Sequence, residues 1–196
     1  ENVLVFTTSA ITGAPISGNP RHCASAKSPL TGGIMNSEGG GYWGPELKFA
    51  GFDAIVLHGK AASPVYLWVH DGQCELRNAS RLWGRETGEV QDAIRQELGD
   101  EKVRVLQIGP AGEKQVRFAA IVNELRHFNG RGGLGAVMGS KNLRAVAVRG
   151  TAQPELADRS KALALARAGA RRVQEGPCWK AFKELGTIQS GTDNTA

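Results

Sequence analysis

Short stretches of apolar residues, some alternating with polar residues and some continuous, predict β-strands along most of the chain. The stretches cover residues 3–8, 52–58, 65–70, 73–77, 103–108, 116–122 and 143–149. The apolar run in 52–58 predicts a strand that is buried on both faces. Asp71-Gly72 separates two of the stretches and predicts a β-hairpin with a two-residue turn.

A helical pattern of apolar residues interrupts the strands at residues 87–98. Apolar side chains fall on one stripe there, at Val90, Ala93, Ile94 and Leu98. Gly99 follows as the expected terminator, because glycine readily adopts the left-handed conformation that ends helices. The sequence therefore predicts one amphipathic helix over residues 87–98.

The composition shifts beyond Pro154 to alanine, leucine, arginine and lysine. Asp158 is the expected N-cap of a helix reaching about residue 175, and Gly176-Pro177 ends it. Apolar residues at 179, 182 and 185 mark a short second helix. We therefore predict two domains, one over residues 1–152 and the beginning of a helical domain over residues 153–196.

Residues 126–142 combine closely spaced glycines with cationic side chains. The glycines stand at 130, 132, 133, 135 and 139, and the cationic donors are Arg126, Arg131, Lys141 and the nearby Arg144. No acidic residue occurs between Glu124 and Glu155. Glycine lets the backbone approach a ligand closely, and the lack of acids removes repulsion, so this segment is typical of a phosphate-binding loop. A tight loop between strands on a basic surface is the alternative.

Residues 17–33 and 36–45 have the same character. No acidic residue lies between Glu1 and Glu38, whereas Arg21 and Lys27 are available as cations. Two such segments predict a clamp around one extended ligand with several phosphates. The alternative is a pair of surface turns, with Trp43 filling the core.

Composition and charge limit the remaining classes of function. The chain has 196 residues, of which 41% are hydrophobic, enough for one domain and part of another. The net charge is +5, but the cations outside the glycine segments are scattered and not interleaved with aromatics, so we expect no nucleic-acid partner. No apolar stretch approaches the roughly 20 residues of a membrane helix.

The cysteines and the chain ends point to an intracellular fragment. Cys23, Cys74 and Cys178 lie too far apart for a disulfide framework or a self-contained metal motif, which favours a reducing, cytoplasmic setting. The first residue is Glu1 rather than methionine, so we expect a piece of a longer polypeptide. The histidines at 22, 58, 70 and 127 are expected to be solvated or satisfied in the core.

Five segments, in order, resemble the amino-terminal domain of the aldehyde ferredoxin oxidoreductase family of tungsten-pterin enzymes. They are residues 27–32 (KSPLTG), 40–48 (GGYWGPELK), 50–53 (AGFD), 108–113 (IGPAGE) and 130–144 (GRGGLGAVMGSKNLR). The resemblance covers residues 1 to about 150, with the beginning of the family domain missing ahead of Glu1. It implies an α+β fold with large twisted β-sheets and a few helices that form a pterin-binding platform, followed by the start of an all-helical domain.

The resemblance also implies a set of cofactor-binding residues. Arg21 would bridge the pterin and an iron-sulfur cluster, Glu38 and Gly40 would line the pterin, and Arg126 with the His127 backbone would face the phosphates. The complete expected set is Arg21, Glu38, Gly39, Gly40, Arg126, His127, Gly130, Arg131, Gly132 and Lys141. Glu38 and His127 would also hold a magnesium ion, although the family often has asparagine and a small residue at these positions; a carboxylate remains a suitable magnesium ligand.

The implied activity is oxidation of an aldehyde to a carboxylic acid at a bis-pterin tungsten centre, with molybdenum as the alternative metal. Electrons would pass through a 4Fe-4S cluster, whose cysteine ligands lie outside this chain, to ferredoxin or an electron-transfer subunit within an oligomeric enzyme. No catalytic acid or base is assigned. Two alternatives stay open: a tungsten-dependent benzoyl-coenzyme A reductase subunit, and a non-catalytic module that binds polyphosphate or nucleic acid.

Overall fold

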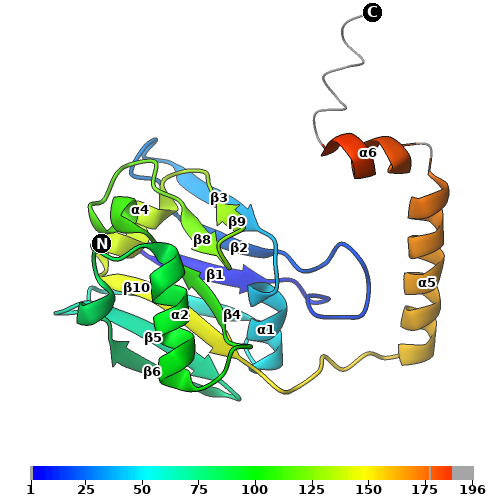
Figure 1. Cartoon of the computed structure of the whole chain (residues 1–196), viewed down its shortest axis with the longest axis horizontal. Helices are drawn as coiled ribbons and strands as arrows, with labels where there is room; N and C mark the ends of the chain where they lie inside the picture. Colours follow the sequence, from blue (N-terminus) through cyan, green and yellow to red (C-terminus); the bar gives the residue numbers. More distant parts are fainter. Residues whose placement is uncertain (1, 177, 187–196) are drawn as a thin grey trace, which may run out of the picture. The chain divides into compact units, whose positions relative to one another are not determined.

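The computed structural model describes residues 2–176 and 178–186. The chain divides into two compact units, one of residues 1–14 and 18–155 and one of residues 15–17 and 156–196. The first unit holds both β-sheets (Figure 1). The fold is α+β, as the sequence predicts.

The smaller sheet is antiparallel, with the strand order β3-β2-β1-β4. Its strands are β1 (Leu4–Thr8), β2 (His22–Lys27), β3 (Ile34–Gly39) and β4 (Ala54–Leu57). β2 and β3 form a hairpin in which Cys23 pairs with Glu38. The hairpin therefore carries the first glycine-rich segment, and β3 forms one edge of the sheet.

The larger sheet has the strand order β6-β5-β10-β7-β8-β9. Its strands are β5 (Val65–His70), β6 (Gln73–Asn78), β7 (Arg104–Gln107), β8 (Ile121–Asn123), β9 (His127–Asn129) and β10 (Leu143–Arg149). β10 is parallel to β5 and antiparallel to β7. The edge strand β9 begins the second glycine-rich segment.

β10 separates two hydrophobic cores because its successive side chains point to opposite faces. Val146 and Val148 belong to a core that also contains Phe6 of β1 and residues of α1 (Trp43–Phe49) and α4 (Leu134–Ser140). Ala145 and Ala147 belong to a core beneath α2 (Thr87–Leu98). Fully buried Trp43 fills the first core and donates its indole N–H to the Val146 carbonyl at 3.0 Å.

Several predicted elements are confirmed. β5 and β6 form the predicted hairpin, with Asp71 at φ 39° and Gly72 at φ 80°. α2 has the predicted bounds, and Gly99 ends it at φ 68°.

Other expectations are wrong. β4 is an exposed edge strand and not a strand buried on both faces, since only β1 pairs with it. Of the strand predicted over 116–122, only β8 forms, at its C-terminal end, and residues 110–113 form the short helix α3 (Pro110–Glu113). A 3-10 turn, η1, covers Ser80–Leu82.

The second unit consists of α5 (Arg159–Glu175) and α6 (Trp179–Leu185). The Asp158 carboxylate accepts the Lys161 N–H at 2.8 Å, which confirms the predicted N-cap. Neither helix contains a buried residue. The predicted helix end at Pro177 and the remainder of the expected helical domain, residues 187–196, lie outside the described residues. Within the described part, no helix has the length and apolarity needed to span a membrane.

Candidate functional site

The two glycine-rich segments meet where the edges of the two sheets adjoin. The Asn129 side-chain amide of β9 donates to the Ser37 carbonyl of β3 at 2.6 Å. The Arg131 backbone N–H donates to the Ser37 hydroxyl at 3.3 Å. The predicted convergence of the segments is therefore confirmed.

A groove of about 530 Å³ lies at this junction. Its lining combines glycines with charged side chains: Gly18, Pro20, Arg21, Glu38, Gly40, Gly41, Arg126, His127 and Phe128. Arg21 Nη1 lies 3.6 Å from Glu38 Oε2, and both side chains are largely exposed, at 64% and 63%. An exposed ion pair of this kind contributes little to stability, so both groups are available to a ligand.

Glycine is required at positions 39 and 41 because side chains would not fit. A Cβ on Gly41, which has φ +87°, would lie 2.7 Å from His127 Cδ2 and 2.8 Å from Asn123 Nδ2. A Cβ on Gly39 would lie 2.7 Å from His22 Cε1. The backbone of residues 39–41 therefore packs directly against side chains of the opposite segment and keeps its own surface free of bulk.

A buried network of polar side chains holds the backbone of residues 37–40 in place. His22 is 1% exposed, and its Nε2 lies 2.9 Å from Asn129 Oδ1. Asn129 in turn holds the Ser37 carbonyl, and the Asn123 amide donates to the Gly40 carbonyl. Burial lowers the pKa of His22 to about 4, against the opposing effect of the Asn129 hydrogen bond, so the imidazole is neutral at pH 7. The expectation of a core histidine is confirmed at this position.

Five of the residues expected to bind a cofactor line the groove together: Arg21, Glu38, Gly40, Arg126 and His127. Gly39 lies within β3, and Gly130, Arg131 and Gly132 continue from β9 along it. A Cβ on Gly132 would collide with the Met35 side chain.

Lys141 is not brought to the groove. It caps the end of α4, is 6% exposed, and donates its Nζ to the Gly59 carbonyl at 3.0 Å. Its ammonium group therefore anchors α4 to the segment after β4.

Arg144 is not available as a phosphate donor, contrary to expectation. It is fully buried, and its Nε lies 2.9 Å from Glu113 Oε1. The same Nε donates its hydrogen to the Leu82 carbonyl at 3.3 Å. Its Nη2 donates to the Arg85 carbonyl at 3.0 Å. Burial lowers the pKa of Arg144 to about 10, and the guanidinium remains charged at neutral pH. The residue therefore ties α3 and the segment before α2 to β10.

The groove fits an anionic cofactor with phosphate groups. Arg21, Arg126 and Arg131 are exposed, and the glycines leave room that side chains would fill. Glu38 offers an oxygen ligand of the kind that magnesium prefers, beside His127. Among the described residues, no group of three or more histidine, cysteine or acidic residues is arranged to hold a metal alone. Phosphate oxygens would have to complete any magnesium site here.

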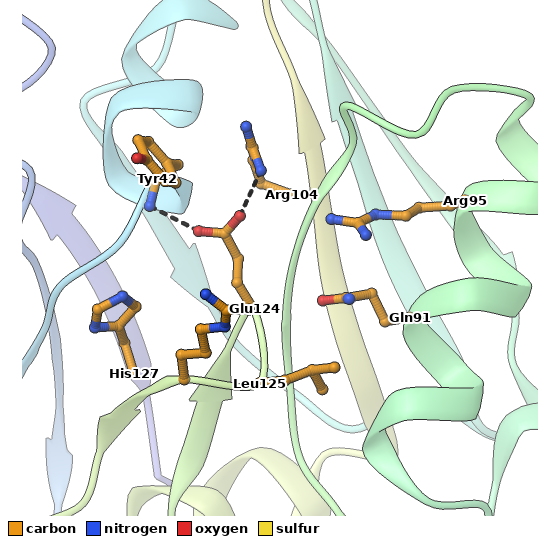
Figure 2. A pocket seen from close by; sticks show the side chains of 8 residues that line it. Tyr42, Gln91, Arg95, Arg104, Glu124, Leu125 and His127 are labelled. Carbon is orange, nitrogen blue, oxygen red and sulfur yellow. Dashed lines mark hydrogen bonds and ion pairs between the residues drawn. The ribbon is translucent and has the colours of Figure 1, made fainter.

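A second cavity of about 450 Å³ adjoins the groove and shares Arg126 and His127 with it. Figure 2 shows this cavity from close by. Its other lining residues are Tyr42, Gln91, Arg95, Arg104, Glu124 and Leu125. Sequence reasoning missed this cavity, because Gln91 and Arg95 have the spacing of an ordinary polar helix face. The only local signal of the cavity in the sequence is Glu124, the acidic residue that directly precedes the stretch without acids.

Comparisons with known proteins find similarity over most of the chain. Residues 1–150 match the family model described as aldehyde ferredoxin oxidoreductase, N-terminal domain. The chain is 48% identical over 177 residues to a tungsten-containing aldehyde ferredoxin oxidoreductase from Pyrococcus abyssi, covering 90% of this chain and 29% of that protein. It is 38% identical over 180 residues to an aliphatic sulfonate oxidoreductase, WOR-like subunit, from Pyrococcus furiosus, covering 85% of this chain and 28% of that protein.

A solved structure resembles the fold closely. It is the active site complex BamBC of benzoyl coenzyme A reductase in complex with 1,5-dienoyl-CoA, at a TM-score of 0.86 and 38% identity. The match covers 89% of this chain and 26% of that chain. The chain therefore spans under a third of the length of the relatives it matches.

Proposed function

The chain belongs to the aldehyde ferredoxin oxidoreductase family, and from that premise we propose that it forms the phosphate-holding wall of the cofactor site in an enzyme that oxidises aldehydes to carboxylic acids. The observation that carries the proposal is the groove in which Arg21 and Glu38 from one glycine-rich segment face Arg126 and His127 from the other. A bis-pterin tungsten cofactor, with molybdenum as the alternative metal, is the proposed ligand.

The residues of this chain bind and orient the cofactor. Arg126 and Arg131 neutralise its phosphates through charge-assisted hydrogen bonds, and the backbone of residues 39–41 lets the ligand approach closely. Glu38 and the His127 carbonyl would hold a magnesium ion. Arg21 exchanges its exposed pairing with Glu38 for a contact at the pterin.

When bound, the cofactor would supply the two-electron oxidation, and a 4Fe-4S cluster held by cysteines outside this chain would supply the route for electrons to ferredoxin or a similar carrier. Cys23, Cys74 and Cys178 are free and lie on separate elements. The residue that acts as general acid or base on the substrate belongs to the part of the enzyme outside this chain. We further propose that residues 1–152 form the cofactor domain and residues 153–196 begin a helical domain, within a cytoplasmic oligomer.

A benzoyl-coenzyme A reductase subunit is the second candidate. The structural similarity at a TM-score of 0.86 favours it. The 48% identity to an aldehyde-oxidising relative, against 38% to the reductase, favours the first candidate. Both candidates use the groove in the same way and differ in the substrate.

Two measurements on the full-length protein test the proposal. Elemental analysis is expected to find tungsten or molybdenum together with iron, and their absence at stoichiometric level would refute both candidates. Acetaldehyde or benzaldehyde oxidation coupled to a viologen dye is then compared with reduction of benzoyl-coenzyme A. Turnover of the coenzyme A ester alone would replace the first candidate by the second.

A further inference from the structure

The cavity beside the groove has the charge of an anion site. Three of its lining residues are arginines, Arg95, Arg104 and Arg126, whereas Glu124 is the one acid in the lining. Glu124 is already neutralised: its Oε1 accepts Arg104 Nη1 at 2.7 Å, and its Oε2 accepts the Tyr42 backbone N–H at 2.7 Å (Figure 2). The cavity therefore keeps an excess of positive charge.

Two of the arginines, Arg95 and Arg104, are positioned before any ligand binds. Arg95 Nε donates to the Val103 carbonyl at 3.0 Å, which directs the guanidinium from α2 into the cavity (Figure 2). Arg104 stacks over the Tyr42 ring at 4.8 Å from its centroid. Within the described residues, Arg95 and Arg126 form no ion pair with a carboxylate, so both retain free donors. Such preorganisation reduces the entropy lost on binding.

Two buried polar atoms at the cavity lack partners. Gln91 is 7% exposed, and its Oε1 has no hydrogen-bond partner among the described residues. Arg104 Nε is likewise buried and unpartnered there. Figure 2 shows the Gln91 side chain extending from α2 into the same space as Arg95. Buried polar groups are nearly always hydrogen-bonded, and Arg104 Nε is a donor that an anionic oxygen of a ligand would satisfy. Gln91 Oε1 is an acceptor, which a phosphate satisfies only through a protonated oxygen.

The turn between β8 and β9 presents the remaining residues in a strained conformation. Glu124 and Leu125 are consecutive non-glycine residues in the left-handed region, at φ 50° and φ 63°. The Arg126 N–H closes the turn on the Asn123 carbonyl at 3.2 Å. This conformation aims Glu124 and Arg126 at the cavity, and such strain gathers at functional sites.

We propose that this cavity is a phosphate subsite in which Arg95, Arg104 and Arg126 bind a phosphate group and the Gln91 amide completes the hydrogen bonding. The group is either a phosphate of the cofactor, reaching past the shared Arg126, or a separate phosphorylated small molecule. The proposal deepens the proposed function and rests on it only for the first of these sources.

Titration calorimetry on the full-length protein, with inorganic phosphate as the probe in a phosphate-free buffer, tests the subsite. Arg95→Gln is expected to weaken binding at least about tenfold, because a charge-assisted hydrogen bond is lost. Gln91→Glu is expected to abolish binding while leaving the fold intact, since Arg95 and Arg104 pair with the new carboxylate. Arg81→Gln is the matched control: it removes the same charge at an exposed residue outside this cavity.

The outcomes separate the sources and the two proposals. Binding only to cofactor-free protein assigns the subsite to a cofactor phosphate, whereas binding to both forms assigns it to a separate ligand. Equal phosphate affinity in wild type, Arg95→Gln and Gln91→Glu overturns the subsite, and so does a lack of binding to both forms. Tungsten content, measured on the wild-type protein, tests the proposed function independently.

Discussion

Gly41 offers the sharpest test of how the groove is built. Its φ is +87°, and an added Cβ would lie 2.7 Å from His127 Cδ2 and 2.8 Å from Asn123 Nδ2. The left-handed conformation costs an alanine roughly 1–2 kcal/mol. The contacts also push the Asn123 amide away from the Gly40 carbonyl, at a cost of about 1–3 kcal/mol for the orphaned group. We expect Gly41→Ala to destabilise this region by about 2–5 kcal/mol in total.

Gly18 provides a matched control within the same groove. Its φ is +89°, yet nothing lies within 4 Å of an added Cβ. Gly18→Ala therefore carries the same backbone strain without the collision, and we expect a loss of only about 1–2 kcal/mol. The two variants separate the effect of contact from the effect of φ.

The assays are tungsten content of the purified full-length protein and hydrogen exchange of peptides covering residues 37–45 and 121–129. Gly41→Ala is expected to lose most of its tungsten and to speed exchange in both peptides by about tenfold or more relative to Gly18→Ala. Equal tungsten content and equal exchange in the two variants would show that close packing of this backbone does not prepare the groove.

Three further outcomes are expected. His22 takes up a proton near pH 6.5 in the unfolded chain but only near pH 4 in the folded protein. Acidification from pH 6.5 to pH 4 therefore lowers the free energy of unfolding by up to about 3 kcal/mol. His22→Gln should remove this part of the pH dependence, measured by denaturant titrations at pH 7 and pH 4.5. Arg144→Met leaves Glu113 as an unpaired buried charge and should cost about 3–5 kcal/mol, visible as a lower melting temperature without a direct effect on groove residues. Arg126→Ala or Arg131→Ala should lower pterin content with unchanged circular dichroism, and full cofactor occupancy in both would contradict the placement of the phosphates.

Sequence patterns predicted the elements whose structure is determined by their own residues. The Asp71-Gly72 turn and the stripe of α2 ending at Gly99 depend on neighbours in sequence, and both are confirmed. The two glycine-rich segments were recognisable from their glycines and their lack of acidic residues, because both properties are visible in the sequence without knowledge of tertiary contacts. The role of Arg144 was not predictable in this way, since its partners lie 31 residues or more away, at Glu113 and Leu82.

Elements made by tertiary contact were missed. β2 and β3 contain small and polar residues with weak strand propensity, and their pairing with each other and β1 produces the strands. α4 contains Gly135 and Gly139, which disfavour a helix in isolation. A Cβ on Gly139 would collide with the Gly112 carbonyl, and one on Gly135 with the Ala120 carbonyl. These glycines permit close backbone packing that no local pattern reveals.

The junction of β3 and β9 has a further consequence for solubility during biosynthesis. Each strand is the outermost of its sheet and would otherwise present unpaired backbone groups to other polypeptides. The Asn129 and Arg131 bonds to Ser37 cover these two edges with each other. Residues that shape the groove thus also protect the newly made chain from intermolecular β-pairing, so we expect their loss to promote aggregation as well as to disturb the groove.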